Sequence, residues 1–139
     1  MADWNTVRND RNYVEPLDPQ IIPLCDALNA AGFATTSSCC GHGRDWPYVC
    51  FQHASDQLVE DLARFILGGE CGDYRPYCSV FQKEIQLNGF AWRVEIHLND
   101  VYESTPHALA MAQAECAIAQ VTRAINAWQT MISSNKGAL

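Results

Sequence analysis

The sequence predicts an α+β domain: a small antiparallel or mixed sheet of about four strands, with three helices packed mainly on one face. Two observations carry this prediction. The expected elements follow the order α-β-β-α-β-β-α, and a strong hairpin pattern joins the last two strands. A chain of 139 residues has the usual size of one domain. We therefore expect an N-terminal arm over residues 1–17, a single domain over 18–132 and a C-terminal tail over 133–139.

The first expected helix follows Asp18-Pro19, because an aspartate before a proline is typical of a helix N-cap. Pro23 would then stand inside that helix. The alternative is that residues 18–22 form a turn and that regular helix begins at Pro23. Gly32 ends the helix. Strands are expected over residues 33–38 and 48–53, with a glycine-bearing turn between them.

Two further helices are expected. Ser55 caps the second helix, and Gly68-Gly69 ends it before a loop over residues 70–76. Thr105-Pro106 starts the third, in which apolar side chains recur every three or four residues as far as Ile132. Its many alanines permit close packing against the sheet or against a second copy of the chain, so a homodimer or higher homo-oligomer is one expectation.

Asn88-Gly89 is the residue pair typical of a type I′ hairpin turn. A turn at this pair sets Ile85 opposite Trp92 and Glu84 opposite Arg93. Apolar side chains then alternate with polar ones along residues 90–98. One face of the hairpin is therefore expected to be apolar, and the other to be an ion-paired or functional face.

Charge and cysteine content limit the partners. The net charge is −7, and the nine basic residues are scattered, so polymeric nucleic acid is not an expected partner. No apolar run approaches the roughly 20 residues of a membrane span, so no membrane partner is expected. The seven cysteines form an odd set and the N-terminus lacks an apolar signal segment, which favours reduced thiols in a cytoplasm.

The strongest functional signal is the turn after the first strand, where hydroxyls, thiols, an imidazole and a guanidinium crowd together. Glycines allow left-handed backbone there, successive amides can form an anion nest, and an arginine can hold a phosphate or carboxylate with two hydrogen bonds. We expect a ligand site here, helped by Arg75 or Arg93. Its turn residues are Ser37, Ser38, Cys39, Cys40, Gly41, His42, Gly43 and Arg44.

Residues 18–42 resemble the N-terminal segment of the tRNA wybutosine-synthesising methyltransferase family, in which a helix runs into a strand ending T-T-S-S-C-S-G-R. Thr35 to Cys39 and Gly41 match, whereas Cys40 replaces a serine and His42 an arginine. The resemblance implies methyl transfer from S-adenosylmethionine to a modified tRNA base, with Ser38, Cys39 and His42 in the site. The segment S-C-C-G-H-G also resembles short uncharacterised phage and prophage proteins, which implies the cytosol of a bacterial host.

Two other chemistries use the same turn. Cys39-x-x-His42 and Cys50-x-x-His53 have spacing typical of zinc ligands, although side chains three apart on an extended strand point to opposite faces. Cys39 or Cys40 could also act as a nucleophile, with His42, His97 or His107 as its base. Neither interpretation gives a complete set of metal ligands or of catalytic residues. We therefore expect a protein that binds a ligand without a cofactor and without catalysis.

The leading hypothesis is a protein that binds a small anionic or nucleotide-type molecule at the turn over residues 37–44. Sequestration of a host nucleotide signal by a phage accessory protein would be one such role. The alternatives are an S-adenosylmethionine-dependent tRNA-modifying enzyme and a dimeric structural module in which the turn is scaffolding.

Overall fold

The computed structural model describes residues 18–52, 54–72, 77–86, 89–98 and 104–137. These residues form three helices and a four-stranded antiparallel sheet, which confirms the α+β class and the order α-β-β-α-β-β-α. None of the described helices combines the length and the apolar character needed to cross a membrane. The elements are α2 (Ile22–Ala30), β1 (Ala34–Cys39), β2 (Tyr48–Gln52), α3 (Asp56–Gly72), β3 (Tyr77–Gln86), β4 (Gly89–Leu98) and α4 (His107–Gly137).

The sheet has the strand order β1-β2-β4-β3, so β1 and β3 form its edges. All three strand pairs are antiparallel. A bulge between Thr35 and Ser37 interrupts the pairing of β1 with β2. Beyond the bulge, Ser37 lies opposite Cys50 and Cys39 opposite Tyr48, so the polar end of β1 runs beside the middle of the sheet.

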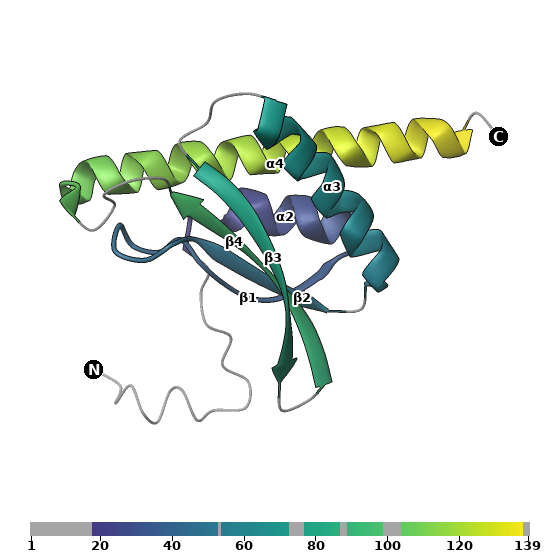
Figure 1. The fold of residues 1–139 in the computed structure, drawn as a ribbon, viewed down its shortest axis with the longest axis horizontal. Coiled ribbons are helices and arrows are strands. Elements are labelled where there is room, and N and C mark those ends of the chain that lie inside the picture. Colours follow the sequence, from purple (N-terminus) through teal and green to yellow (C-terminus); the bar gives the residue numbers. More distant parts are fainter. Residues whose placement is uncertain (1–17, 53, 73–76, 87–88, 99–103, 138–139) are drawn as a thin grey trace.

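The helices α2, α3 and α4 lie on one side of the sheet (Figure 1). The core fills the space between these two layers. Phe33, which follows α2, packs edge-on against Phe51 of β2 with ring centroids 5.2 Å apart, and also lies 5.9 Å from the Trp128 ring of α4. These aromatic contacts join α2, β2 and α4 into one apolar layer.

The start of α2 agrees with the turn alternative. Regular helix begins after Ile21, with a proline in the first turn, and the Ile21 amide donates to the Asp18 carbonyl at 3.0 Å. Asp18 is therefore not the N-cap of this helix. Its carboxylate instead accepts a hydrogen bond from the backbone of Cys40, 22 residues away.

The hairpin register differs from the expected one. Gln86 pairs with Gly89 and Ile85 with Phe90, so Glu84 lies opposite Ala91 rather than Arg93. Gly89 already belongs to β4, so the expected turn at residues 88–89 is wrong. The observed pairing differs from the expected one by two residues, which keeps each side chain on its face.

Two helix ends also differ from expectation. Gly68 and Gly69 do not end α3, which continues to Gly72. α4 continues to Gly137, through most of the segment expected to be a tail. Glycine disfavours helix by only about 1 kcal/mol, so packing of the α3 face against the sheet can carry the helix past it.

Candidate functional site

The turn between β1 and β2 has an uncommon backbone. Gly41, His42 and Gly43 follow one another with φ of 84°, 53° and 74°, all in the left-handed region that L-residues seldom adopt. The Gly41 carbonyl accepts hydrogen bonds from the amides of Arg44 and Asp45, both at 2.9 Å. The chain therefore closes on itself within the five residues 41–45, and His42 is the second residue of that loop.

The amides of this turn donate to acceptors within the protein. Cys40 N–H donates to Asp18 Oδ2 at 3.1 Å, Gly41 N–H to Cys39 Sγ at 3.3 Å, and His42 N–H to Cys40 Sγ at 3.4 Å. An external anion could use these three amides only by displacing a carboxylate and two sulfur atoms. An anion nest made from them, as the sequence suggested, is therefore not what this geometry offers.

The turn is anchored by the start of α4. His107 Nε2 lies 2.7 Å from the carbonyl oxygen of His42, so its N–H donates to that oxygen. A Cβ added at Gly43 would lie 2.8 Å from the His107 ring and 3.1 Å from Met111 Cγ. α4 therefore packs directly on the turn backbone, and the loop is held between Asp18, in the segment before α2, and the first residues of α4.

Asp18, Cys39 and His42 bring three potential metal-ligand atoms together. One carboxylate oxygen, Cys39 Sγ and one imidazole nitrogen all lie within 4.8 Å of one another. His42 Nε2 is 3.5 Å from Asp18 Oδ2, and the His42 side chain is 63% exposed. Its other ring nitrogen, Nδ1, is 3.7 Å from Cys40 Sγ. Burial raises the pKa of the Cys40 thiol, which keeps that sulfur protonated.

The strand order shows how the turn meets the polar face of the hairpin. Ser37, Cys50 and Arg93 form one cross-strand row over β1, β2 and β4. At the far end of the turn, the Trp46 indole stacks on the His97 ring of β4, with centroids 3.8 Å apart and planes 20° apart. The turn and the polar face therefore form one continuous surface.

On that face Arg93 is already neutralised. Its guanidinium lies 2.9 Å from Glu84, 3.4 Å from Glu95 and 4.2 Å above the Tyr48 ring. Burial by itself would lower the pKa of Arg93, but the neighbouring Cys50, Glu84 and Glu95 outweigh it and raise that pKa. Glu95 Oε1 also forms a hydrogen bond with His97 Nε2 at 2.7 Å. Two carboxylates around one guanidinium leave this patch poorly suited to an anion.

The remaining expected ligand residues are dispersed. Ser38 lies on the helix-covered side, where its hydroxyl is buried beside the Cys25 thiol. Burial is also the main cause of the raised pKa of Cys25. Arg44 has an exposed side chain at the turn. Arg75 lies outside the described residues, so its expected contribution is untested.

The sequence suggested Cys39, His42, Cys50 and His53 as zinc ligands, and the structure groups these residues differently. Cys39 and His42 lie together, but the group they form includes Asp18 rather than Cys50. Cys50 is buried in the middle of β2, and His53 lies outside the described residues. Asp18 was missed because its place before a proline resembled an N-cap. Pro23 was the signal that could have corrected this, since a helix starting there leaves the Asp18 carboxylate available.

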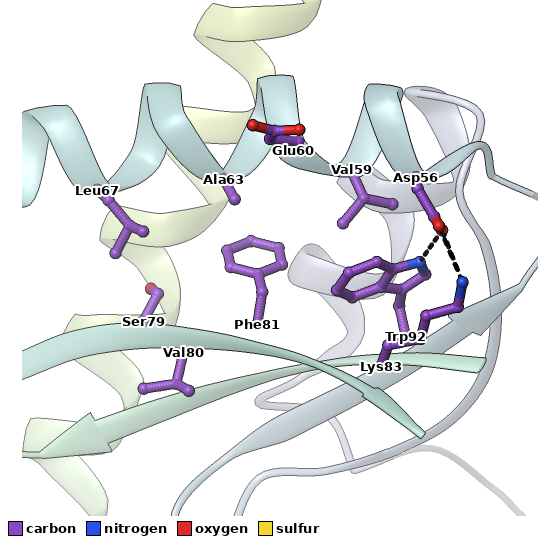
Figure 2. A pocket seen from close by; sticks show the side chains of 10 residues that line it. All are labelled: Asp56, Val59, Glu60, Ala63, Leu67, Ser79, Val80, Phe81, Lys83 and Trp92. Atoms are coloured by element: carbon purple, nitrogen blue, oxygen red, sulfur yellow. Dashed lines mark hydrogen bonds and ion pairs between the residues drawn. The ribbon is translucent and has the colours of Figure 1, made fainter. Parts of the chain in front are cut away.

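A separate cavity of about 570 Å³ lies between α3 and the strands β3 and β4 (Figure 2). At one end Asp56 accepts hydrogen bonds from Lys83 Nζ at 2.8 Å and Trp92 Nε1 at 3.2 Å. The Lys83 hydrogen bond is the main cause of the lowered pKa of Asp56. Apolar side chains form most of the wall, among them Val59, Leu67 and Phe81. The cavity adjoins the β3 edge of the sheet, whereas the turn adjoins β1.

Comparison of the chain with protein-family models, curated proteins and solved structures finds no match.

Proposed function

We propose that this protein binds a small anionic molecule of the nucleotide type at the turn over residues 37–44. The observation that carries the proposal is His42: an exposed, non-glycine residue held at φ 53°. Left-handed conformation is costly for such a residue and persists only where the surroundings impose it, which happens most often at functional sites. The contacts from Asp18 and His107 impose it here.

Side chains rather than amides would hold the ligand. Arg44, two residues after His42, is exposed and can form two parallel hydrogen bonds to a phosphate or carboxylate. Trp46 is 41% exposed, and the indole face opposite His97 can stack on a planar base. Asp18 and Asp45 flank the same turn, and their negative charges disfavour an extended polyanion.

The resemblance to short phage and prophage proteins supports an accessory role in a host cytosol, and sequestration of a nucleotide signal is one role that a binding protein could have there. In this proposal the ligand is retained rather than turned over. S-adenosylmethionine belongs among the ligands to be tested, because its binding would instead favour the methyltransferase alternative.

Isothermal titration with inorganic phosphate, a panel of mono- and dinucleotides and S-adenosylmethionine tests this proposal. We expect Arg44→Ala to weaken binding of the preferred anion by about tenfold or more, because a charge-assisted hydrogen bond is lost. Arg64→Ala is the matched control: it removes the same charge from an exposed arginine on α3 that pairs with Glu60. Equal affinities in wild type and Arg44→Ala would place the ligand elsewhere.

A further inference from the structure

We propose that Asp18, Cys39 and His42 form a binding site for a divalent metal ion of the zinc class, with one coordination position open to an external ligand. The three residues come from separate parts of the chain: Asp18 from the turn before α2, Cys39 from the end of β1 and His42 from the left-handed turn. Metal binding itself does not depend on the function proposed above. The identity of the external ligand, a small anion, rests on that function.

The ligand atoms are close to the spacing that a tetrahedral site needs. Zinc bonds of about 2.0–2.3 Å place neighbouring ligands roughly 3.3–3.6 Å apart. His42 Nε2 and Asp18 Oδ2 are already 3.5 Å apart, and all three ligand atoms lie within 4.8 Å of one another. Side-chain rotations that move the ligand atoms by about an ångström would bring all three to the spacing of zinc ligands. The exposed His42 ring has the freedom to make that movement.

Outer contacts orient each ligand. Metal-bound histidines usually donate their second ring N–H to a nearby acceptor. His42 Nδ1 lies 3.7 Å from Cys40 Sγ, so a proton on Nδ1 would be shared with that sulfur and Nε2 would present its lone pair. Cys39 Sγ accepts the Gly41 amide at 3.3 Å, and Asp18 Oδ2 accepts the Cys40 amide at 3.1 Å.

The donor set narrows the choice of metal. A thiolate and an imidazole favour zinc and similar transition metals over magnesium or calcium, which prefer oxygen ligands alone. The carboxylate and the thiolate together neutralise a dication. Three protein ligands leave a fourth position, and the exposure of His42 opens it to solvent. A bound metal would offer an anion a coordination bond at this open position, which the occupied amides do not provide.

Metal binding can be measured without any other ligand. Chelator-treated protein is titrated with zinc chloride by calorimetry, and with cobalt(II) by absorption spectroscopy. We expect one metal per chain and a thiolate-to-cobalt charge-transfer band. Cys39→Ser should abolish the band, and His42→Ala and Asp18→Asn should each weaken zinc binding at least about tenfold. Cys116→Ser, at an exposed position on α4, is the matched control and should leave both measurements unchanged.

A second measurement uses the wild-type chain, so that it does not depend on the folding of a variant. Zinc should slow alkylation of Cys39 while leaving the exposed Cys78 and Cys116 as reactive as before, as mapped by mass spectrometry. The site is disproved if wild-type protein binds neither metal, or if zinc binds but leaves the reactivity of Cys39 unchanged.

The anion is then tested separately, with inorganic phosphate as the probe in the presence and absence of zinc. Binding that strengthens with zinc supports both proposals. Zinc binding without phosphate or nucleotide binding leaves the metal site standing and refutes the proposed function. Equal anion affinity with and without zinc would show that the anion does not occupy the open coordination position of the metal. The proposed anion site would then stand without the metal.

Discussion

A side chain at position 41 would collide with its own turn. A Cβ added to Gly41 overlaps the Asp45 carbonyl oxygen, whereas one added to Gly32 meets no atom within 4 Å. Both glycines have positive φ, 84° and 97° respectively. The pair therefore separates the cost of left-handed backbone from the cost of a steric clash. Asp18 and His107 then hold this turn in place through Cys40 and His42.

Gly32→Ala should lower the free energy of unfolding by about 1 kcal/mol, the cost of a left-handed alanine. Gly41→Ala should lower it by about 2 kcal/mol more, because backbone atoms must move to admit the methyl group. Urea denaturation of the two variants beside wild type measures both values. Equal losses would mean that the turn relaxes without cost and is not the rigid loop described above.

The thiols should differ in reactivity. Burial is the main cause that raises the pKa of Cys25 and of Cys40, so at pH 8 less of each exists as the reactive thiolate. Cys78 and Cys116 are exposed. Timed alkylation with iodoacetamide, followed by peptide mapping, should modify the two exposed cysteines first. Early modification of Cys40 in folded protein would show that the turn opens readily to solvent.

Helix α4 joins the core to the turn. Its Trp128 is buried against Phe33, and its first residue, His107, bonds the turn. A single helix thus fixes both the apolar layer and the loop that carries His42. Loss of packing far along α4 should therefore reduce overall stability, while the local hydrogen bonds of the turn remain intact until the molecule unfolds.

Trp128→Ala should lower the free energy of unfolding by about 3–5 kcal/mol, the range for truncating a buried aromatic side chain. Met131→Ala is the control on the same helix, because Met131 is 43% exposed and should cost less than about 1 kcal/mol. Chemical denaturation followed by circular dichroism reports both. A loss below about 1 kcal/mol for Trp128→Ala would contradict the packing described for this helix.

Periodicity and turn residues were enough to predict which elements exist, because they are local signals. These local signals were not enough to predict helix ends and strand register, which depend on packing. Gly68 and Gly69 lie within α3 because its face is held on the sheet, and Gly89 pairs with Gln86 although the sequence suggested a turn at Asn88-Gly89. The composition of residues 37–44 located the turn, but not its partners: Asp18 and His107 reach it across 22 and 65 residues.

Across the whole molecule, the metal site would act as a cross-link between the segment before α2, the end of β1 and the turn. An ion that binds only the folded chain stabilises it by mass action, by about 2.7 kcal/mol at a hundredfold excess over Kd. Zinc should therefore raise the Tm of wild-type protein and of Cys116→Ser, but not that of Cys39→Ser. Protons compete with metal for the thiolate and imidazole, so the increase should shrink in acid.

The most direct test is anomalous diffraction at the zinc absorption edge, from crystals grown with zinc. We predict one strong peak bonded to Asp18, Cys39 and His42, with a solvent molecule or small anion completing a tetrahedron. A peak elsewhere, for example beside Glu95 and His97, or no peak in protein that calorimetry shows to be saturated at one equivalent, would contradict the assignment of the metal site to this turn.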